Sequence, residues 1–405
     1  MEGKRKIIFK VFLVLFTLGI AGLAALFCEF WLERQKDVTL PEPTGTFAVG
    51  RVTYAWGDET PDTLAPDAGT KREIFVWVWY PAAGHPGKTY EYLPAPWRKA
   101  IDNTRAGIIR LMTRDLSKVH AHSLPDTDIS PRQSSYPVVL FRAGASTQVT
   151  NYTTLVEDLA SHGYVVVGID APYRTRVVVF PDGRVVERTR KNNPELYRGE
   201  ELDRVADKLI AAWTSDMSFA LDKLEDLNNS DASGKFKGRL DMARIGVFGH
   251  SFGGAQAAQF CHDDSRCRAG IDIDGMPYGS VIKTGIKQPF MFLISGKGDF
   301  SSGDEVKKFN TDIQSICGHS PAEGHLRVVI RGANHFTFSD DGALLKSHII
   351  LSIFSFLGRL GMDGRRQLAV TAYCVSSFFD EHLKGIHDDH FEKFHQLYPE
   401  IQILN

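Results

Sequence analysis

The chain has 405 residues, of which 43% are hydrophobic, 11% aromatic and 24% charged, a composition typical of globular proteins and not of disordered or fibrous ones. The formal net charge of -2 offers no general attraction to nucleic acid or acidic lipid, so we expect no nucleic-acid partner. The sequence contains no internal repeat, low-complexity tract or zinc-type cysteine spacing, and it leaves the oligomeric state open.

A long apolar run lies near the start of the chain. Basic residues at Lys4–Lys10 precede apolar residues at Val11–Phe27, and about 20 such residues cross a bilayer as a helix. The basic flank should stay in the cytoplasm, which would place the chain after Glu33 outside. We therefore expect a signal anchor over residues 1–35, with an extracytoplasmic globular part. The alternative is a signal peptide cleaved near Gly22–Ala24, which would make the protein secreted.

The next part of the chain mixes strand and helix patterns. A linker at 36–45 precedes two predicted strands, at 47–54 and 74–80, which are rich in aromatic and β-branched residues. An insertion at 92–135 holds a helix-like stretch from Trp97 to Leu116. Its apolar residues alternate with basic ones, so it could cap a pocket or lie at a lipid headgroup interface.

From Pro137 onward, apolar runs typical of buried parallel strands alternate with amphipathic helices. The predicted strands are 137–141, 164–170, 244–249, 268–274, 289–295 and 326–331. The predicted helices are 152–162, 200–227, 251–260 and most of 344–382, with a hairpin at 177–187. This alternation predicts an α/β fold, with a mostly parallel sheet covered by helices on both faces. We assign residues 46–385 to this domain and 386–405 to a C-terminal tail.

A nucleophile motif joins one of these strands to a helix. Gly249-His250-Ser251-Phe252-Gly253 matches G-x-S-x-G, in which the serine occupies a sharp turn between strand and helix. A predicted strand precedes the motif here and a predicted helix follows it, as that turn requires. The sequence therefore predicts an α/β-hydrolase fold with Ser251 as the nucleophile.

The serine needs a base, and in this fold the order along the chain is serine, acid, histidine. His335 follows the last predicted strand and should lie at the carboxyl edge of the sheet, where active sites of such folds are found. His319 and His325 fall at the wrong end of that strand, and His348 lies inside a predicted helix. We therefore predict His335 as the base.

Two aspartates compete for the role of the acid. Asp274 ends the strand after the nucleophile helix, and Asp299 follows the next strand. Both lie at carboxyl ends and either could orient the imidazole, whereas Asp272 lies two residues earlier and should be structural. The fold rules alone leave Asp274 and Asp299 both open.

An oxyanion hole requires two backbone N–H groups directed at the developing negative charge. One should come from Phe252, directly after the nucleophile. The other should come from the loop Arg142–Ser146, whose small residues allow a close backbone approach, and we expect Ala145 to be this donor.

Four segments together resemble the plasma-type platelet-activating-factor acetylhydrolases and their bacterial relatives. They are Val78–Pro81, Tyr136–Phe141 with its glycine loop, Asp158–Gly163 and Gly249–Ala255. The resemblance covers roughly residues 45–385 and implies an ester hydrolase of lipid-like or short-chain substrates. It also implies Asp274 as the acid. The chain departs from the family in having Ala143, preceded by Arg142, before the loop glycine, where the family often has histidine or proline.

This reading implies acyl transfer through an acyl-serine, without a metal or organic cofactor. Two alternatives remain open. One is another activity on the same fold, such as a polyester hydrolase or a peptidase, and the other is a degenerate, membrane-anchored binding module. Among the cysteines, Cys261 and Cys267 are close enough for a short-loop disulfide, although buried thiols are an equal possibility.

Overall fold

The computed structural model describes residues 2–85, 89–105, 107, 113–145, 147–296, 303–321, 324–344, 361–387 and 396–404. Within these residues a ten-stranded sheet forms the centre of the molecule. In spatial order its strands are β15 (Ile401–Leu404), β14 (His325–Ile330), β13 (Phe290–Ser295), β12 (Cys267–Ile273), β11 (Leu240–His250), β7 (Tyr136–Arg142), β8 (Val165–Asp170), β3 (Lys71–Ala82), β2 (Ala48–Pro61) and β6 (Leu124–Pro125).

The six strands from β14 to β8 in this order are parallel, and they are the strands predicted after Pro137. Antiparallel strands flank them, because β3 pairs with β8 and β2, and β15 pairs with β14. Strands β7, β8 and β13 are buried along their whole length, which explains their continuous apolar sequences. The mostly parallel sheet of the predicted α/β fold is confirmed.

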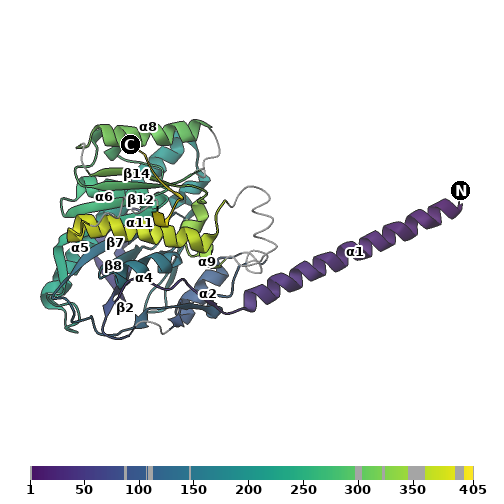
Figure 1. Cartoon of the computed structure of the whole chain (residues 1–405), viewed down its shortest axis with the longest axis horizontal. Coiled ribbons are helices and arrows are strands. Elements are labelled where there is room, and N and C mark those ends of the chain that lie inside the picture. Colours follow the sequence, from purple (N-terminus) through teal and green to yellow (C-terminus); the bar gives the residue numbers. More distant parts are fainter. Residues whose placement is uncertain are drawn as a thin grey trace.

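Helices cover both faces of the sheet (Figure 1). On one face, α4 (Thr153–Ser161) and α11 (Gly364–Lys384) pack on the sheet and on each other. On the other face lie α5 (Gly199–Ser230), α6 (Phe252–Asp263) and α8 (Gly303–Gly318). Each face has its own cluster of buried apolar side chains, so the sheet separates two halves of the core.

Smaller elements connect the strands of the sheet and the helices that cover it. They are β1 (Val38–Thr39), β4 (Tyr90–Glu91), β5 (Val119–Ala121), β9 (Val177–Val179), β10 (Val185–Glu187), α2 (Ala95–Asn103), α7 (Val281–Thr284) and α9 (Asp341–Leu344). Strands β9 and β10 form the hairpin predicted at 177–187. The expected linker contributes β1, which pairs with β5, and the expected tail contributes β15.

The helix predicted from Trp97 to Leu116 is wrong in its extent. Helix α2 ends at Asn103, where Thr104 follows as its C-cap, and Leu116 begins a separate 3₁₀ turn. Trp97 is only 3% exposed and packs against the Phe75 and Trp77 rings, with ring centroids 5.1 Å apart in each pair. Trp97 therefore faces the core and is not available to lipid headgroups.

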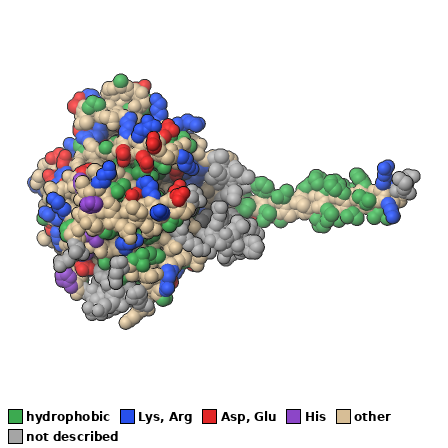
Figure 2. All heavy atoms as spheres, turned by 90° about the horizontal axis from the view of Figure 1, so that it is seen from above, with side chains coloured by type: hydrophobic (Ala, Val, Ile, Leu, Met, Phe, Trp, Pro, Cys, Tyr) green, Lys and Arg blue, Asp and Glu red, His purple; other side chains and the backbone are tan. Residues whose placement is uncertain are grey.

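The apolar N-terminal run forms α1 (Glu2–Gln35), which projects away from the body (Figure 1). The most apolar 18-residue window of its segment Gly3–Gln35 has a mean hydropathy of 2.6, and none of that window is buried. Hydrophobic side chains surround the rod, and basic side chains lie near its tip (Figure 2). A signal sequence and a membrane anchor share these properties.

The body holds the end of α1 through Arg114, which is buried. Its Nη1 donates to the carbonyls of Glu33 at 2.6 Å and Lys36 at 3.0 Å, and its Nε donates to Leu344 O at 3.2 Å. A cation at a helix C-terminus satisfies carbonyls that the helix leaves without partners. Arg34 on α1 donates in turn to Thr113 O of the body at 2.8 Å, so each of the two parts donates hydrogen bonds to the other.

Cys261 and Cys267 form a disulfide between the end of α6 and the start of β12. Among the described cysteines, Cys28, Cys317 and Cys374 are free.

Candidate active site

The turn between β11 and α6 places Ser251 at the carboxyl edge of the sheet. Ser251 has φ 57° and ψ -127°, outside the usual regions for a residue with a Cβ. Glycines make this turn possible: a Cβ on Gly249 would lie 2.1 Å from Gly253 O, and one on Gly253 would lie 2.3 Å from Arg142 O. The Ser251 N–H donates to Ile273 O at 2.7 Å, which ties the turn to β12.

The structure brings Ser251, His335 and Asp274 together in one hydrogen-bonded line. His335 Nδ1 lies 2.7 Å from Asp274 Oδ2, and His335 Nε2 lies 3.1 Å from Ser251 Oγ. With the proton on Nδ1, the imidazole donates to the carboxylate and accepts from the serine hydroxyl. This geometry equips His335 to remove the serine proton.

Two neighbours hold Asp274 and the loop of His335 in place. The Ser295 N–H and hydroxyl both donate to the Asp274 carboxylate, at 2.8 to 2.9 Å, so the acid keeps hydrogen bonds on both oxygens. The loop that carries His335 is held by Gln367 of α11, which accepts from Asn334 N at 2.9 Å and donates to Asn334 O at 2.8 Å. Sequence reasoning did not identify either neighbour, because both contacts join distant segments.

The other sequence candidates lie elsewhere. Asp272 is buried and accepts from the Gly275 N–H at 2.8 Å, and burial holds the pKa of its carboxyl well above the ordinary value. His319 follows α8 and His325 begins β14, at the opposite edge of the sheet. Asp299 and His348 lie outside the described residues.

The expected oxyanion loop follows β7 and approaches the nucleophile closely. A Cβ on Gly144 would lie 3.3 Å from Ser251 Cβ, so this loop runs directly beside the serine. The carbonyl of Ala145 accepts a hydrogen bond from Arg188 Nη1. Phe252 opens α6, so its N–H is one of the first-turn donors that a helix leaves without an internal partner.

A polar pair behind the loop was also missed from the sequence. Tyr152 Oη accepts from the Gly144 N–H at 3.4 Å and is hydrogen-bonded to His250 Nδ1 at 2.7 Å. Burial is the largest cause that holds the pKa of His250 well below its ordinary value, and the nearby His335 lowers this pKa further. His250 is therefore neutral, and its ring packs 4.6 Å from that of His335 without adding a second charge.

Comparisons with known proteins agree on one family. The model of the family described as platelet-activating factor acetylhydrolase, isoform II, matches residues 32–402. The platelet-activating factor acetylhydrolase of Canis lupus familiaris is 26% identical over 384 residues, which cover 87% of this chain and 79% of the dog protein. A probable 1-alkyl-2-acetylglycerophosphocholine esterase of Arthroderma benhamiae is 25% identical over 293 residues, 69% of each chain.

A solved structure, the ferulic acid esterase of Streptomyces cinnamoneus, shares the fold. It aligns with a TM-score of 0.70 at 24% identity, over 91% of this chain and 99% of that one. The family match extends from the end of α1 to β15, and thus includes Ser251, Asp274 and His335. The chain therefore belongs to the family of platelet-activating factor acetylhydrolase, isoform II.

Proposed function

We propose that this chain is a serine ester hydrolase that cleaves short-chain or phospholipid-like carboxylic esters through an acyl-serine intermediate. Ser251 is the nucleophile, His335 the general base and Asp274 the acid that orients the imidazole. The observation that carries the proposal is the line of hydrogen bonds from Asp274 through His335 to Ser251, at 2.7 and 3.1 Å.

In the first half of the reaction, Ser251 Oγ attacks the ester carbonyl while His335 Nε2 takes the serine proton. The carbonyl oxygen becomes an oxyanion, which the N–H groups of Phe252 and Ala145 stabilise. Collapse of this intermediate breaks the ester bond, and the imidazolium gives its proton to the leaving alcohol. Asp274 stabilises the imidazolium throughout.

In the second half, water replaces the alcohol. His335 takes a proton from the water as its oxygen attacks the acyl carbonyl of Ser251. The second tetrahedral intermediate collapses to the free acid, and the proton returns to Ser251 Oγ. The same oxyanion donors serve both halves.

The named relatives and the apolar helix α1 together indicate the class of ester that is the substrate. Relatives named acetylhydrolase and 1-alkyl-2-acetylglycerophosphocholine esterase favour a glycerophospholipid with a short acyl group. The exposed apolar helix α1 supports a location at a membrane, with the catalytic body on the extracytoplasmic side, or secretion if the helix is cleaved. A lipid ester presented at that surface fits both observations.

Replacement of Ser251 by alanine tests the proposal. The variant should lose hydrolysis of p-nitrophenyl acetate and labelling by a fluorophosphonate probe, with its thermal unfolding temperature unchanged, because only one small hydroxyl is removed. A panel of p-nitrophenyl esters of increasing chain length should show the highest kcat/KM for the shortest acyl groups. Retention of a tenth or more of wild-type kcat/KM would exclude Ser251 as the nucleophile (a single triad member contributes about 10⁴-fold or more).

A further inference from the structure

The oxyanion loop begins at a buried arginine, Arg142, the last residue of β7. Its side chain is only 3% exposed, and its backbone carbonyl packs against Gly253 of the elbow. Its Nε donates to Gln256 Oε1 on the nucleophile helix at 2.9 Å, and its guanidinium carbon lies 3.1 Å from the centre of the Trp213 ring. Arg142 therefore contacts both segments that are expected to supply the oxyanion donors.

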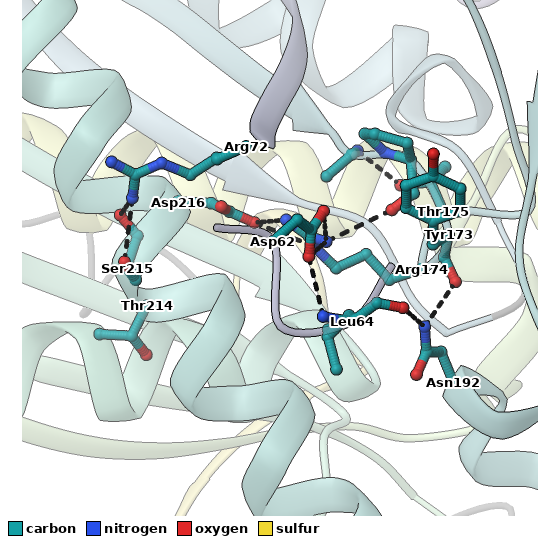
Figure 3. A network of polar contacts seen from close by, with 12 residues as sticks. Asp62, Leu64, Arg72, Tyr173, Arg174, Thr175, Asn192, Thr214, Ser215 and Asp216 are labelled. Atoms are coloured by element: carbon teal, nitrogen blue, oxygen red, sulfur yellow. Dashed lines mark hydrogen bonds and ion pairs between the residues drawn. The ribbon is translucent and has the colours of Figure 1, made fainter. Parts of the chain in front are cut away.

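A second buried arginine nearby shows how such a charge is usually accommodated. Arg174 is bound by two carboxylates, Asp62 and Asp216, which lie on either side of it (Figure 3). Its Nη1 lies 2.8 Å from Asp62 Oδ2, and its Nη2 lies 2.6 Å from Asp216 Oδ2. The buried charge of Arg174 is thus paired directly with two charges of opposite sign.

Arg142 has no such partner in the described part of the chain. No carboxylate oxygen there lies within 4.0 Å of its guanidinium, and its Nη1 has no hydrogen-bond partner. Asp170 and Asp216 act on it only from a greater distance. Burial lowers the pKa of Arg142 to about 9, so the group still carries its charge at neutral pH. A buried cation without a carboxylate partner is costly for folding.

Arg142 borders the region where the oxyanion is expected to form. Arg142, Ala145 and Phe252 line the same small cavity, of about 10 Å³, together with Trp213 and Gln256. The Arg142 side chain and the two residues that are expected to donate to the oxyanion therefore share one small cavity.

We propose that Arg142 supports the oxyanion hole electrostatically: its buried positive charge stabilises the negative charge that forms on the substrate oxygen. This inference rests on the proposed function. In a site that excludes water, a fixed charge behind the donors acts more strongly than it would in solvent, and it needs no rearrangement during the reaction.

A pair of inhibitors isolates this effect. A short-chain trifluoromethyl ketone forms a bond from its carbonyl carbon to Ser251 Oγ: the carbonyl π electrons move to the oxygen as negative charge, and the serine proton moves to His335 Nε2. The matching methyl ketone binds without forming this anion. The inhibition constant of the methyl ketone divided by that of the trifluoromethyl ketone therefore measures stabilisation of the oxyanion. This ratio does not respond to a general change in folding or binding.

Four variants of the full-length protein in detergent are compared. R142M removes the charge and R142K keeps it. Q256E places a carboxylate beside Arg142 Nε, which neutralises the charge with the arginine still in place. Q288E is the matched control, because Gln288 precedes β13 and lies at the opposite edge of the sheet. Thermal unfolding is measured for each variant.

We expect the inhibitor ratio to fall on the order of tenfold in R142M and Q256E, and to stay near the wild-type value in R142K and Q288E. Q256E decides the question if R142M fails to fold. A ratio within about twofold of wild type in Q256E would overturn the role of the charge. Undiminished binding of the trifluoromethyl ketone to S251A would instead overturn the assignment of the nucleophile.

Discussion

Ser251 and Asp274 both have left-handed backbone conformations, with φ of 57° and 54°. Such conformations cost about 1 to 3 kcal/mol for residues with a side chain and persist only where neighbours enforce them. Here the enforcing bonds are those of Ser251 N to Ile273 O and Asp274 N to Leu293 O, at 2.7 and 2.8 Å. The strain directs the two side chains toward His335 from adjacent strands.

Asp274→Asn tests the acid. The asparagine amide can accept from either His335 or Ser295, but it lacks the charge that stabilises the imidazolium, so kcat/KM for p-nitrophenyl acetate should fall by roughly 10⁴. Asp272→Asn is the matched control on the same strand. It should cost less than about tenfold, because Asp272 contacts Gly275 and not the base. The reverse order would assign the role of the acid to another residue.

At the scale of single residues, the sequence predicted those candidate site residues that a short motif or a position after a strand specifies. Ser251 and His335 follow from a motif and from a position after a strand, and the structure places them 3.1 Å apart. Residue patterns alone left the acid open between Asp274 and Asp299. Tyr152 was not anticipated, because its contact with His250 joins residues 98 positions apart in the chain. Contacts of that range depend on the packed fold, which no local pattern specifies.

Strands and helices with a clear hydrophobic pattern were predicted well from the sequence, and strands of a few residues were not. Strands β7, β8 and β13 are apolar runs that are buried along their whole length, which makes them recognisable in the sequence. Strands β1, β6 and β15 have two to four residues and exist because a neighbouring strand edge is available to pair with them. The helix predicted from Trp97 to Leu116 ends at Asn103, and Thr104, a poor helix former, is its C-cap.

Helix α2 should contribute to stability through Trp97. Trp97→Ala removes an indole packed against Phe75 and Trp77, and should lower the free energy of unfolding by about 3 to 5 kcal/mol. Trp31→Ala on α1 is the control, because Trp31 is 54% exposed and its loss should leave urea unfolding unchanged. Equal effects of the two substitutions would contradict the burial of Trp97.

Asp340 connects α4 to the loop that carries His335. Its carboxylate accepts from the Thr153 and Thr154 N–H groups at 2.9 and 3.0 Å, and from the Tyr92 hydroxyl at 2.9 Å. Burial nevertheless raises the pKa of Asp340 to about 7. The folded state therefore binds this proton more tightly than the unfolded state, whose carboxyl has a pKa of about 4.

Stability supplied by Asp340 is complete below about pH 4 and is lost as the pH rises through about 7. Asp340→Asn removes this dependence. The advantage of the wild type over the variant in free energy of unfolding should shrink by about 2 to 3 kcal/mol between pH 5 and pH 8, as measured by urea titration. A constant difference across that range would show that the carboxyl does not titrate there.

At the scale of the whole molecule, α1 and the catalytic body are two distinct parts (Figure 1). If α1 is an uncleaved anchor, the protein should stay in the pellet when membranes are extracted with alkaline carbonate, because only integral segments resist that treatment. External protease should digest the body on intact cells. Release of the protein into the supernatant would favour a cleaved signal peptide.

The Arg114 junction has a mechanical consequence for such an anchored enzyme. Helix α1 has 34 residues and is about 50 Å long, whereas the hydrocarbon core of a bilayer is about 30 Å thick. Where the bilayer is thinner than the hydrophobic stretch of α1, the helix accommodates the mismatch by tilting. Because Arg114 fixes the end of α1 to the body, the body turns with the helix. Local bilayer thickness would then set the angle between the carboxyl edge of the sheet, where Ser251 lies, and the lipid surface.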